Sequence, residues 1–77
     1  MPERIALLGS TGSIGTQALD IISKFPEKFV VEVLIAGNNI DLLTEQAYQY
    51  HPDSVAIANP VYYLQLKENL RGTNIKV

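Results

Sequence analysis

Three glycines and three hydroxyl side chains lie close together near the N-terminus and could bind a phosphate group. They form the segment Gly9-Ser10-Thr11-Gly12-Ser13-Ile14-Gly15. Backbone N–H groups at a helix N-terminus are unpaired and carry partial positive charge, so they bind anions without a basic side chain. Glycines there permit a tight turn, close approach of a pyrophosphate and close packing of the helix on a sheet. The hydroxyls of Ser10, Thr11 and Ser13 could add hydrogen bonds to phosphate oxygens. The segment therefore predicts a nucleotide-phosphate site.

The alternative interpretation of this segment is a turn that only joins two packed elements. Its spacing is Gly-x-x-Gly-x-x-Gly, not the commoner Gly-x-Gly-x-x-Gly. Its place at the first junction of a predicted strand and helix favours nucleotide binding. No Lys-Ser or Lys-Thr pair follows Gly15, so the segment is not a P-loop.

The segment Ala36-Gly37-Asn38-Asn39, at the end of the second predicted strand, bears on the choice between NAD and NADP. A carboxylate there would accept hydrogen bonds from the ribose hydroxyls and repel a 2′-phosphate, which selects NAD. This chain has no carboxylate at the strand tip, and asparagine amides can donate to a phosphate, so we favour NADP. Asp41 follows shortly after, and we interpret it as a first-turn helix residue favoured by the helix dipole.

Hydrophobic periodicity predicts the elements that would position these loops. The expected order is strand 5–8, helix 13–24, strand 29–36, helix 40–50, strand 55–58, helix 60–70 and the start of a strand at 74–77. Asn39 and Asn59 are expected helix caps. Strict alternation predicts right-handed crossovers and an α/β fold. We expect a Rossmann-like parallel sheet with helices on both faces, and residues 1–77 would be its N-terminal part.

Composition excludes several classes of protein. A net charge of −2 with mixed signs gives no electrostatic reason to expect nucleic acid or a membrane as partner. The absence of Cys excludes disulfide scaffolds, thiolate zinc sites and thiol nucleophiles. No apolar run approaches the roughly 18 residues of a membrane helix, and no signal peptide is apparent. We expect a cytoplasmic protein that begins at its natural start and is the front part of a longer chain.

The remaining polar residues do not predict a catalytic centre. His51, the only histidine, stands before Pro52 at an expected helix end, and we interpret it as solvated. The aspartates and glutamates are scattered, with no spacing typical of metal ligands. We therefore predict that this chain contains neither catalytic residues nor metal ligands.

Two stretches resemble a known enzyme family. The run Gly-Ser-Thr-Gly-Ser-Ile-Gly-Thr-Gln at 9–17, within 5–20, is far more specific than three glycines alone. Together with Ala36-Gly37-Asn38-Asn39-Ile40 and Glu45-Gln46, it resembles the start of the 1-deoxy-D-xylulose 5-phosphate reductoisomerases. The open alternatives are another Rossmann enzyme, such as a semialdehyde dehydrogenase or sugar epimerase, and a non-catalytic nucleotide-sensing module.

The resemblance implies an NADPH-dependent oxidoreductase of non-mevalonate isoprenoid biosynthesis, which converts 1-deoxy-D-xylulose 5-phosphate to 2-C-methyl-D-erythritol 4-phosphate. It further implies a homodimer and a divalent metal, Mg or Mn, held in a catalytic domain outside this chain. The implied cofactor-binding residues are Thr11, Gly12, Ser13, Ile14, Gly37, Asn38 and Asn39. Many family members carry Lys or Arg where this chain has Asn38, so charge would contribute less to holding the 2′-phosphate here.

Overall fold

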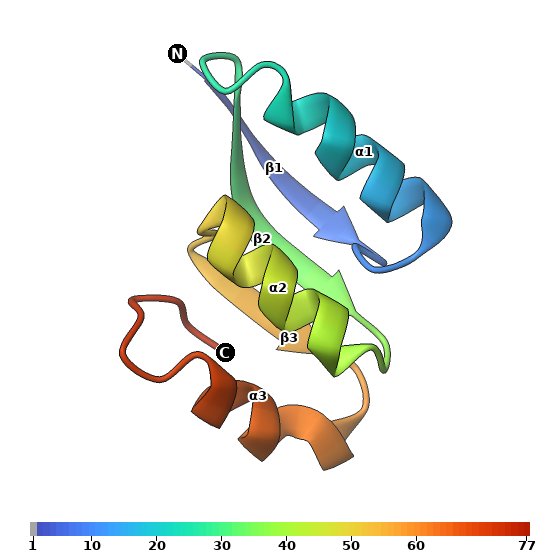
Figure 1. The fold of residues 1–77 in the computed structure, drawn as a ribbon, viewed down its shortest axis with the longest axis vertical. Helices are drawn as coiled ribbons and strands as arrows, with labels where there is room; N and C mark the ends of the chain where they lie inside the picture. Colours follow the sequence, from blue (N-terminus) through green and yellow to red (C-terminus); the bar gives the residue numbers. More distant parts are fainter. Residues whose placement is uncertain (1) are drawn as a thin grey trace.

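Three parallel strands form one sheet in the computed structural model, which describes residues 2–77. The strands, in the order β1-β2-β3, are β1 (Glu3–Leu8), β2 (Phe29–Ala36) and β3 (Ser54–Ile57). The helices are α1 (Ser13–Ser23), α2 (Ile40–Tyr50), the short 3₁₀ helix η1 (Pro60–Tyr62) and α3 (Tyr63–Asn69). Figure 1 shows this alternation of strand and helix along the chain. The predicted α/β fold with a parallel sheet is confirmed.

The central strand β2 supplies the middle of the core. Its Val31, Leu34 and Ala36 are buried, as the apolar, β-branched sequence of this segment predicts. The other buried core residues come from the three helices, the C-cap of α3 and β3; they are Leu19, Ile22, Leu43, Ala47, Val55, Leu66 and Leu70. None of the helices within residues 2–77 is long and apolar enough to cross a membrane.

All three helices pack on one face of the sheet, which differs from the expected arrangement with helices on both faces. Buried residues of α1, α2 and α3 belong to one core cluster with Val31, Leu34 and Ala36 of β2, and the opposite face carries the exposed Ala6 and Leu8 of β1. The reason is the strand order. The steps from β1 to β2, from β2 to β3 and from β3 to the segment at Lys76 all move the same way across the sheet, and right-handed crossovers in one direction put their helices on one face.

The start of the fourth strand lies beside β3. Lys76 forms a parallel bridge with Ser54, its carbonyl accepts from the Val55 N–H at 2.8 Å, and its N–H donates to the Asp53 carbonyl at 3.1 Å. The prediction of a strand beginning at 74–77 is thus met by a single bridge. Within residues 2–77 the outer edge of β1 has no neighbouring strand.

One charged residue interrupts the apolar pattern of β2. The register of β1 and β2 shifts by one residue at Glu32, because Ile5 pairs with Val31 and Ala6 with Val33. Glu32 accepts from Arg4 Nε at 3.1 Å, and Arg4 also pairs with Asp53. The hydrogen bond and charge of Glu32, with the charge of Asp53, raise the pKa of Arg4 above its ordinary value.

Candidate functional site

The turn between β1 and α1 is fixed against the end of β2. Gly9 has φ 74°, a left-handed conformation that favours glycine. The N–H groups of Gly9 and Ser10 both donate to the Ile35 carbonyl, at 2.8 and 3.0 Å. The N–H of Gly12 donates back to the Gly9 carbonyl at 3.0 Å and closes the turn. The chain therefore enters α1 in a defined direction at the carboxyl edge of the sheet.

The N-terminus of α1 has no side-chain cap. Its N-cap residue is Gly12, and no acidic residue lies in its first turn. The first intrahelical donor at this end is Thr16, whose N–H lies 2.9 Å from the Gly12 carbonyl. The N–H groups of residues 13–15 thus have no partner within the helix. Gly12, Ser13 and Ile14 are exposed and Thr11 is half-buried, so all four predicted residues of this loop are open to a ligand.

Gly15 and Gly12 serve different purposes. A Cβ on Gly15 would lie 2.2 Å from the Gly9 carbonyl oxygen and 2.8 Å from Ser10 Cα, so this glycine permits the helix to pack against the turn. A Cβ on Gly12 would meet only the Gly9 oxygen, at 3.4 Å, an ordinary contact. The packing around position 12 would therefore accept a side chain, and the space beside it is open.

Ser10 contradicts one expectation, because its hydroxyl does not face the phosphate side of the turn. The residue is completely buried, and its Oγ has no hydrogen-bond partner within the described residues. Its carbonyl accepts from Nε2 of Gln46, at 2.8 Å. The sequence reasoning assigned Gln46 no role. The available signal was its place on the buried stripe of α2, between Leu43 and Ala47, where a polar residue needs a partner.

The second predicted loop, at residues 37–39, is exposed and held by three hydrogen bonds of asparagine residues. The Asn39 Oδ1 accepts from the Leu42 N–H at 3.2 Å and caps α2, as expected. The Asn38 Oδ1 accepts from Asn59 Nδ2 at 2.9 Å, and the Asn59 N–H donates to the Gly37 carbonyl at 3.1 Å. Asn59 was expected only as a helix cap, a role it also fills for η1. Its contact with Asn38 is not encoded in any local pattern.

The two loops lie at the same edge of the sheet. β1 and β2 are adjacent and parallel, Leu8 pairs with Ile35, and each loop begins directly after its strand. Figure 1 shows the arrowheads of β1 and β2 pointing in the same direction. An extended ligand could therefore contact both loops at once. Crevices outside the carboxyl ends of parallel strands are the usual ligand sites of such folds.

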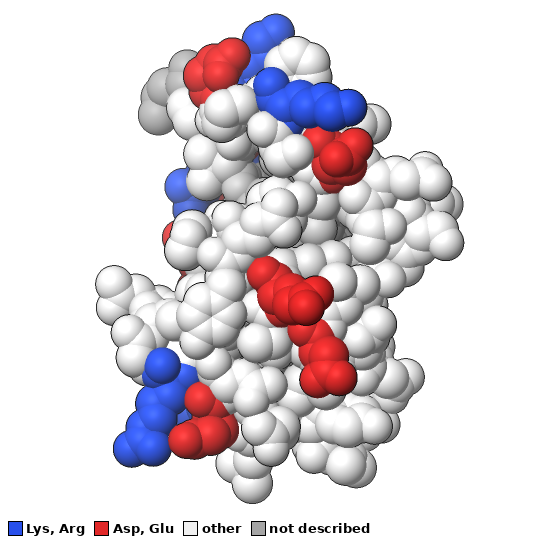
Figure 2. Space-filling view, in the orientation of Figure 1, with Lys and Arg blue, Asp and Glu red and all other residues white. Residues whose placement is uncertain are grey.

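The charged side chains do not gather around one site. Figure 2 shows acidic and basic groups interspersed on the drawn face of the described residues. No group of three or more His, Cys, Asp or Glu side chains that could hold a metal ion occurs within residues 2–77. The groups that the glycine-rich turn offers to an anion are therefore backbone N–H groups at the positive end of α1.

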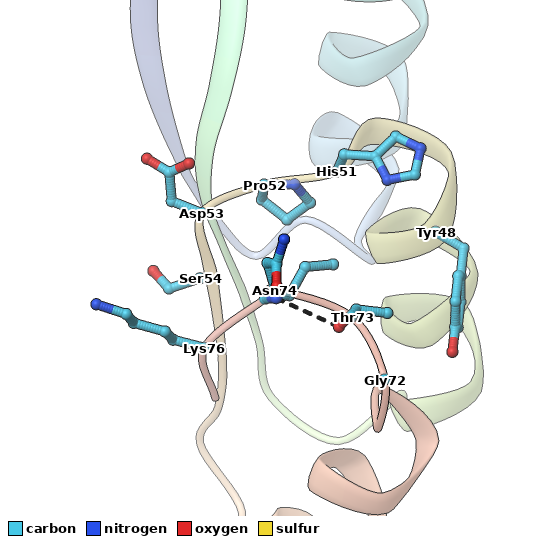
Figure 3. A pocket seen from close by; sticks show the side chains of 10 residues that line it. Tyr48, His51, Pro52, Asp53, Ser54, Gly72, Thr73, Asn74 and Lys76 are labelled. Atoms are coloured by element: carbon cyan, nitrogen blue, oxygen red, sulfur yellow. Dashed lines mark hydrogen bonds between the residues drawn. The ribbon is translucent and has the colours of Figure 1, made fainter.

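A separate hollow lies at the amino end of β3, on the opposite edge of the sheet (Figure 3). Its polar lining residues come from the end of α2, the start of β3 and the segment after α3; they are Tyr48, His51, Asp53, Ser54, Thr73, Asn74 and Lys76. His51 is exposed, as expected, and has φ 50°, a left-handed conformation that ends α2. Since this edge is remote from the carboxyl ends of the strands, the hollow is not part of the candidate nucleotide site.

The sequence of the chain is similar to those of known proteins. A family model described as 1-deoxy-D-xylulose 5-phosphate reductoisomerase matches residues 5–77. The enzyme of that name from Phocaeicola vulgatus is 53% identical over 77 residues, which are 100% of this chain and 20% of the relative.

Solved structures agree with this match. The Zymomonas mobilis reductoisomerase in complex with NADPH superimposes with a TM-score of 0.94 and 34% identity, over 99% of this chain and 20% of that one. A DOX-P reductoisomerase in complex with NADPH, fosmidomycin and magnesium gives a TM-score of 0.87 and 31% identity, over 96% of this chain and 19% of that one. The chain thus spans about a fifth of the length of these relatives. It belongs to the 1-deoxy-D-xylulose 5-phosphate reductoisomerase family.

Proposed function

We propose that residues 1–77 form the N-terminal part of the NADPH-binding domain of an enzyme that converts 1-deoxy-D-xylulose 5-phosphate to 2-C-methyl-D-erythritol 4-phosphate. The observation that carries this proposal is the uncapped N-terminus of α1 beside Gly12, at the carboxyl edge of a parallel sheet. Family membership supports the same cofactor, because a relative with this fold is solved in complex with NADPH. It also argues against the semialdehyde dehydrogenase and sugar epimerase alternatives.

The described residues fit the phosphate end of NADPH. The free N–H groups of the first turn of α1 would bind the pyrophosphate, with Thr11, Gly12, Ser13 and Ile14 around it. The position of Gly12 is open, so the backbone can come close to an anion. When bound, NADPH supplies the hydride for the reduction.

The loop after β2 would bind the adenosine side of the cofactor. Gly37, Asn38 and Asn39 are exposed there, and the loop contains no carboxylate that would repel a 2′-phosphate. Asn59 holds the Asn38 side chain by its oxygen, which leaves the Asn38 amide N–H groups to donate. We propose that this loop selects NADPH over NADH for two reasons. No carboxylate repels the 2′-phosphate, and the uncharged Asn38 amide can donate hydrogen bonds to it.

The divalent metal does not fit the described residues. The acidic residues within 2–77 form no cluster that could hold Mg or Mn, so the ligands of that metal and the catalytic residues would belong to the catalytic domain. The magnesium of the relative belongs to a chain about five times as long. The predicted homodimer and cytoplasmic location remain predictions.

A chimera tests the proposed function. Residues 1–77 replace the matched 77 residues of the Phocaeicola vulgatus reductoisomerase, and the unaltered relative is the control. We expect the chimera to bind NADPH and to oxidise it with the sugar phosphate and Mg at a rate within about tenfold of the control. A chimera that melts cooperatively but does not bind NADPH would contradict the proposal.

A further inference from the structure

A buried hydrogen bond joins α2 to the glycine-rich turn. Gln46 lies in the second turn of α2 and is 4% exposed, and Ser10 is 0% exposed. The Gln46 Nε2 donates to the Ser10 carbonyl at 2.8 Å, between residues 36 positions apart in the sequence. Within residues 2–77, no other side-chain hydrogen bond reaches this turn from another element.

This bond fixes the orientation of one peptide group. The Ser10 carbonyl and the Thr11 N–H belong to the same planar unit, and no cis peptide occurs in the described residues. In a trans peptide the N–H points opposite to the C=O. Since the carbonyl points to buried Gln46, the Thr11 N–H points away from α2, toward the open side of the turn. The preceding peptide is held separately, because the Ser10 N–H donates to the Ile35 carbonyl at 3.0 Å, so the peptides on both sides of the Ser10 Cα have hydrogen-bond partners.

We propose that Gln46 is a positioning residue that aims the Thr11 N–H at the pyrophosphate of NADPH. This inference rests on the proposed function. It extends the proposed function, because the direction of the Thr11 N–H donor is assigned to Gln46 of α2. Gln46 itself would not touch the ligand. Gln46 thus couples the packing of α2 to the shape of the phosphate site.

The residue type supports positioning over simple packing. The neighbours of Gln46 on the buried face of α2, Leu43 and Ala47, are apolar. Gln46 instead buries an amide whose Oε1 has no hydrogen-bond partner within the described residues. The buried Ser10 Oγ also has no partner there. A buried polar atom without a partner destabilises a fold. A gain elsewhere is needed to offset that loss, and orientation of the turn provides it.

Gln46→Met in the chimera tests the proposal, since methionine has a similar length and no donor. We expect NADPH affinity to fall about tenfold, the range for one lost hydrogen bond to a charged group. Binding of adenosine 2′-monophosphate, which lacks the pyrophosphate, should stay within about twofold, because that ligand needs only the loop at 37–39. Both affinities are measured by titration calorimetry.

The matched control is Thr44→Val on the same helix. It removes the hydrogen bond that the Thr44 hydroxyl accepts from Asn69 of α3, at 3.1 Å, and leaves the glycine-rich turn untouched. Thr44→Val should lower the melting temperature without a selective loss of affinity for NADPH over adenosine 2′-monophosphate. A loss of affinity for both ligands in Gln46→Met, or for neither, would overturn the proposal.

Gln46→Leu is the second variant, in case the methionine variant does not fold. If neither variant folds while Thr44→Val does, Gln46 serves the fold and not the cofactor, and the proposal is wrong. Failure of the unaltered chimera to bind NADPH would instead contradict the proposed function. The two failures are therefore distinguishable.

Discussion

Helices α1 and α2 both begin at the carboxyl edge of the sheet, but their first turns differ in what satisfies the backbone N–H groups. At α2 the Asn39 side chain accepts from Leu42, and Asp41 adds a negative charge at the positive end of the helix. At α1 the N-cap is Gly12, with neither a side-chain acceptor nor an acidic residue in the first turn. The first turn of α2 finds a side-chain acceptor in its own sequence, while the N–H groups in the first turn of α1 have none and are available to an outside acceptor.

The difference shows how stability and binding are divided between neighbouring loops. A capped helix start gains stability from its own side chain and has little left to offer an anion. An uncapped start gives up that gain and keeps its N–H groups free. Because α2 is capped by its own residues and also holds Ser10 through Gln46, the stable helix supports the unsatisfied one.

The largest expected effect is on the packing of α1. In Gly15→Ala, the new methyl group would lie 2.2 Å from the Gly9 oxygen and meet the Ser10 backbone, which cannot move aside without distorting the turn. We expect a loss of about 3 kcal/mol of unfolding free energy, well above the roughly 1 kcal/mol that alanine gains in helix propensity. Urea unfolding of the chimera measures this.

Gly12→Ala is the matched control for that change, because its Cβ would meet only an ordinary contact at 3.4 Å. We expect its stability to stay close to that of the unaltered chimera. Equal losses for the two alanine variants would mean that the two glycines do not differ in role.

The next effect concerns the cofactor alone. Gly12→Val should leave the fold largely intact, because Gly12 has φ −78° and ψ 173°, a conformation open to any residue. Its methyl groups would occupy the space through which the backbone approaches the pyrophosphate. We expect the Kd for NADPH to rise at least about 100-fold, or ~2.7 kcal/mol, in a fluorescence titration. Unchanged affinity would remove this turn from the site.

The sequence was sufficient for elements whose signals are local. The apolar run at β2 and the stripe of α2 gave Phe29–Ala36 and Ile40–Tyr50 with their observed bounds. The caps at Asn39 and Asn59 were also predicted, because a cap depends on neighbours two or three residues away.

Long-range relations were not predictable in the same way. The position of α3 in the single helical layer depends on which strand the segment at 74–77 joins. Nothing in the sequence near Lys76 encodes its pairing with Ser54. The contacts of Gln46 with Ser10 and of Asn59 with Asn38 join residues 36 and 21 positions apart. Such pairs depend on tertiary packing, so a pattern of spacing finds the elements but not the side chains that connect them.

A smaller effect is expected on the choice of cofactor. Asn38→Asp keeps an oxygen that can accept from Asn59 Nδ2, so the side chain should stay in place while it gains a negative charge. That charge should repel the 2′-phosphate of NADPH and offer the ribose of NADH an acceptor.

We expect the ratio of kcat/KM for NADPH to that for NADH to fall about tenfold. Gln49→Glu places the same charge on an exposed part of α2 away from this edge and serves as control. If both variants leave the ratio unchanged, Asn38 does not lie beside the ribose.

The smallest effect tests the capped side of the comparison. Asn39→Ala removes the acceptor of the Leu42 N–H and should lower the unfolding free energy by about 1 kcal/mol, the usual loss for an N-cap. Asn39→Asp keeps an acceptor, so its stability should stay within about 0.5 kcal/mol of the unaltered chimera.

The aspartate removes the amide donor and adds a charge, which separates capping from cofactor binding. If Asn39 also contacts the 2′-phosphate, Asn39→Asp loses NADPH affinity without losing stability. If its only role is the cap, Asn39→Ala alone shows a change, and that change is in the urea midpoint and not in the NADPH titration.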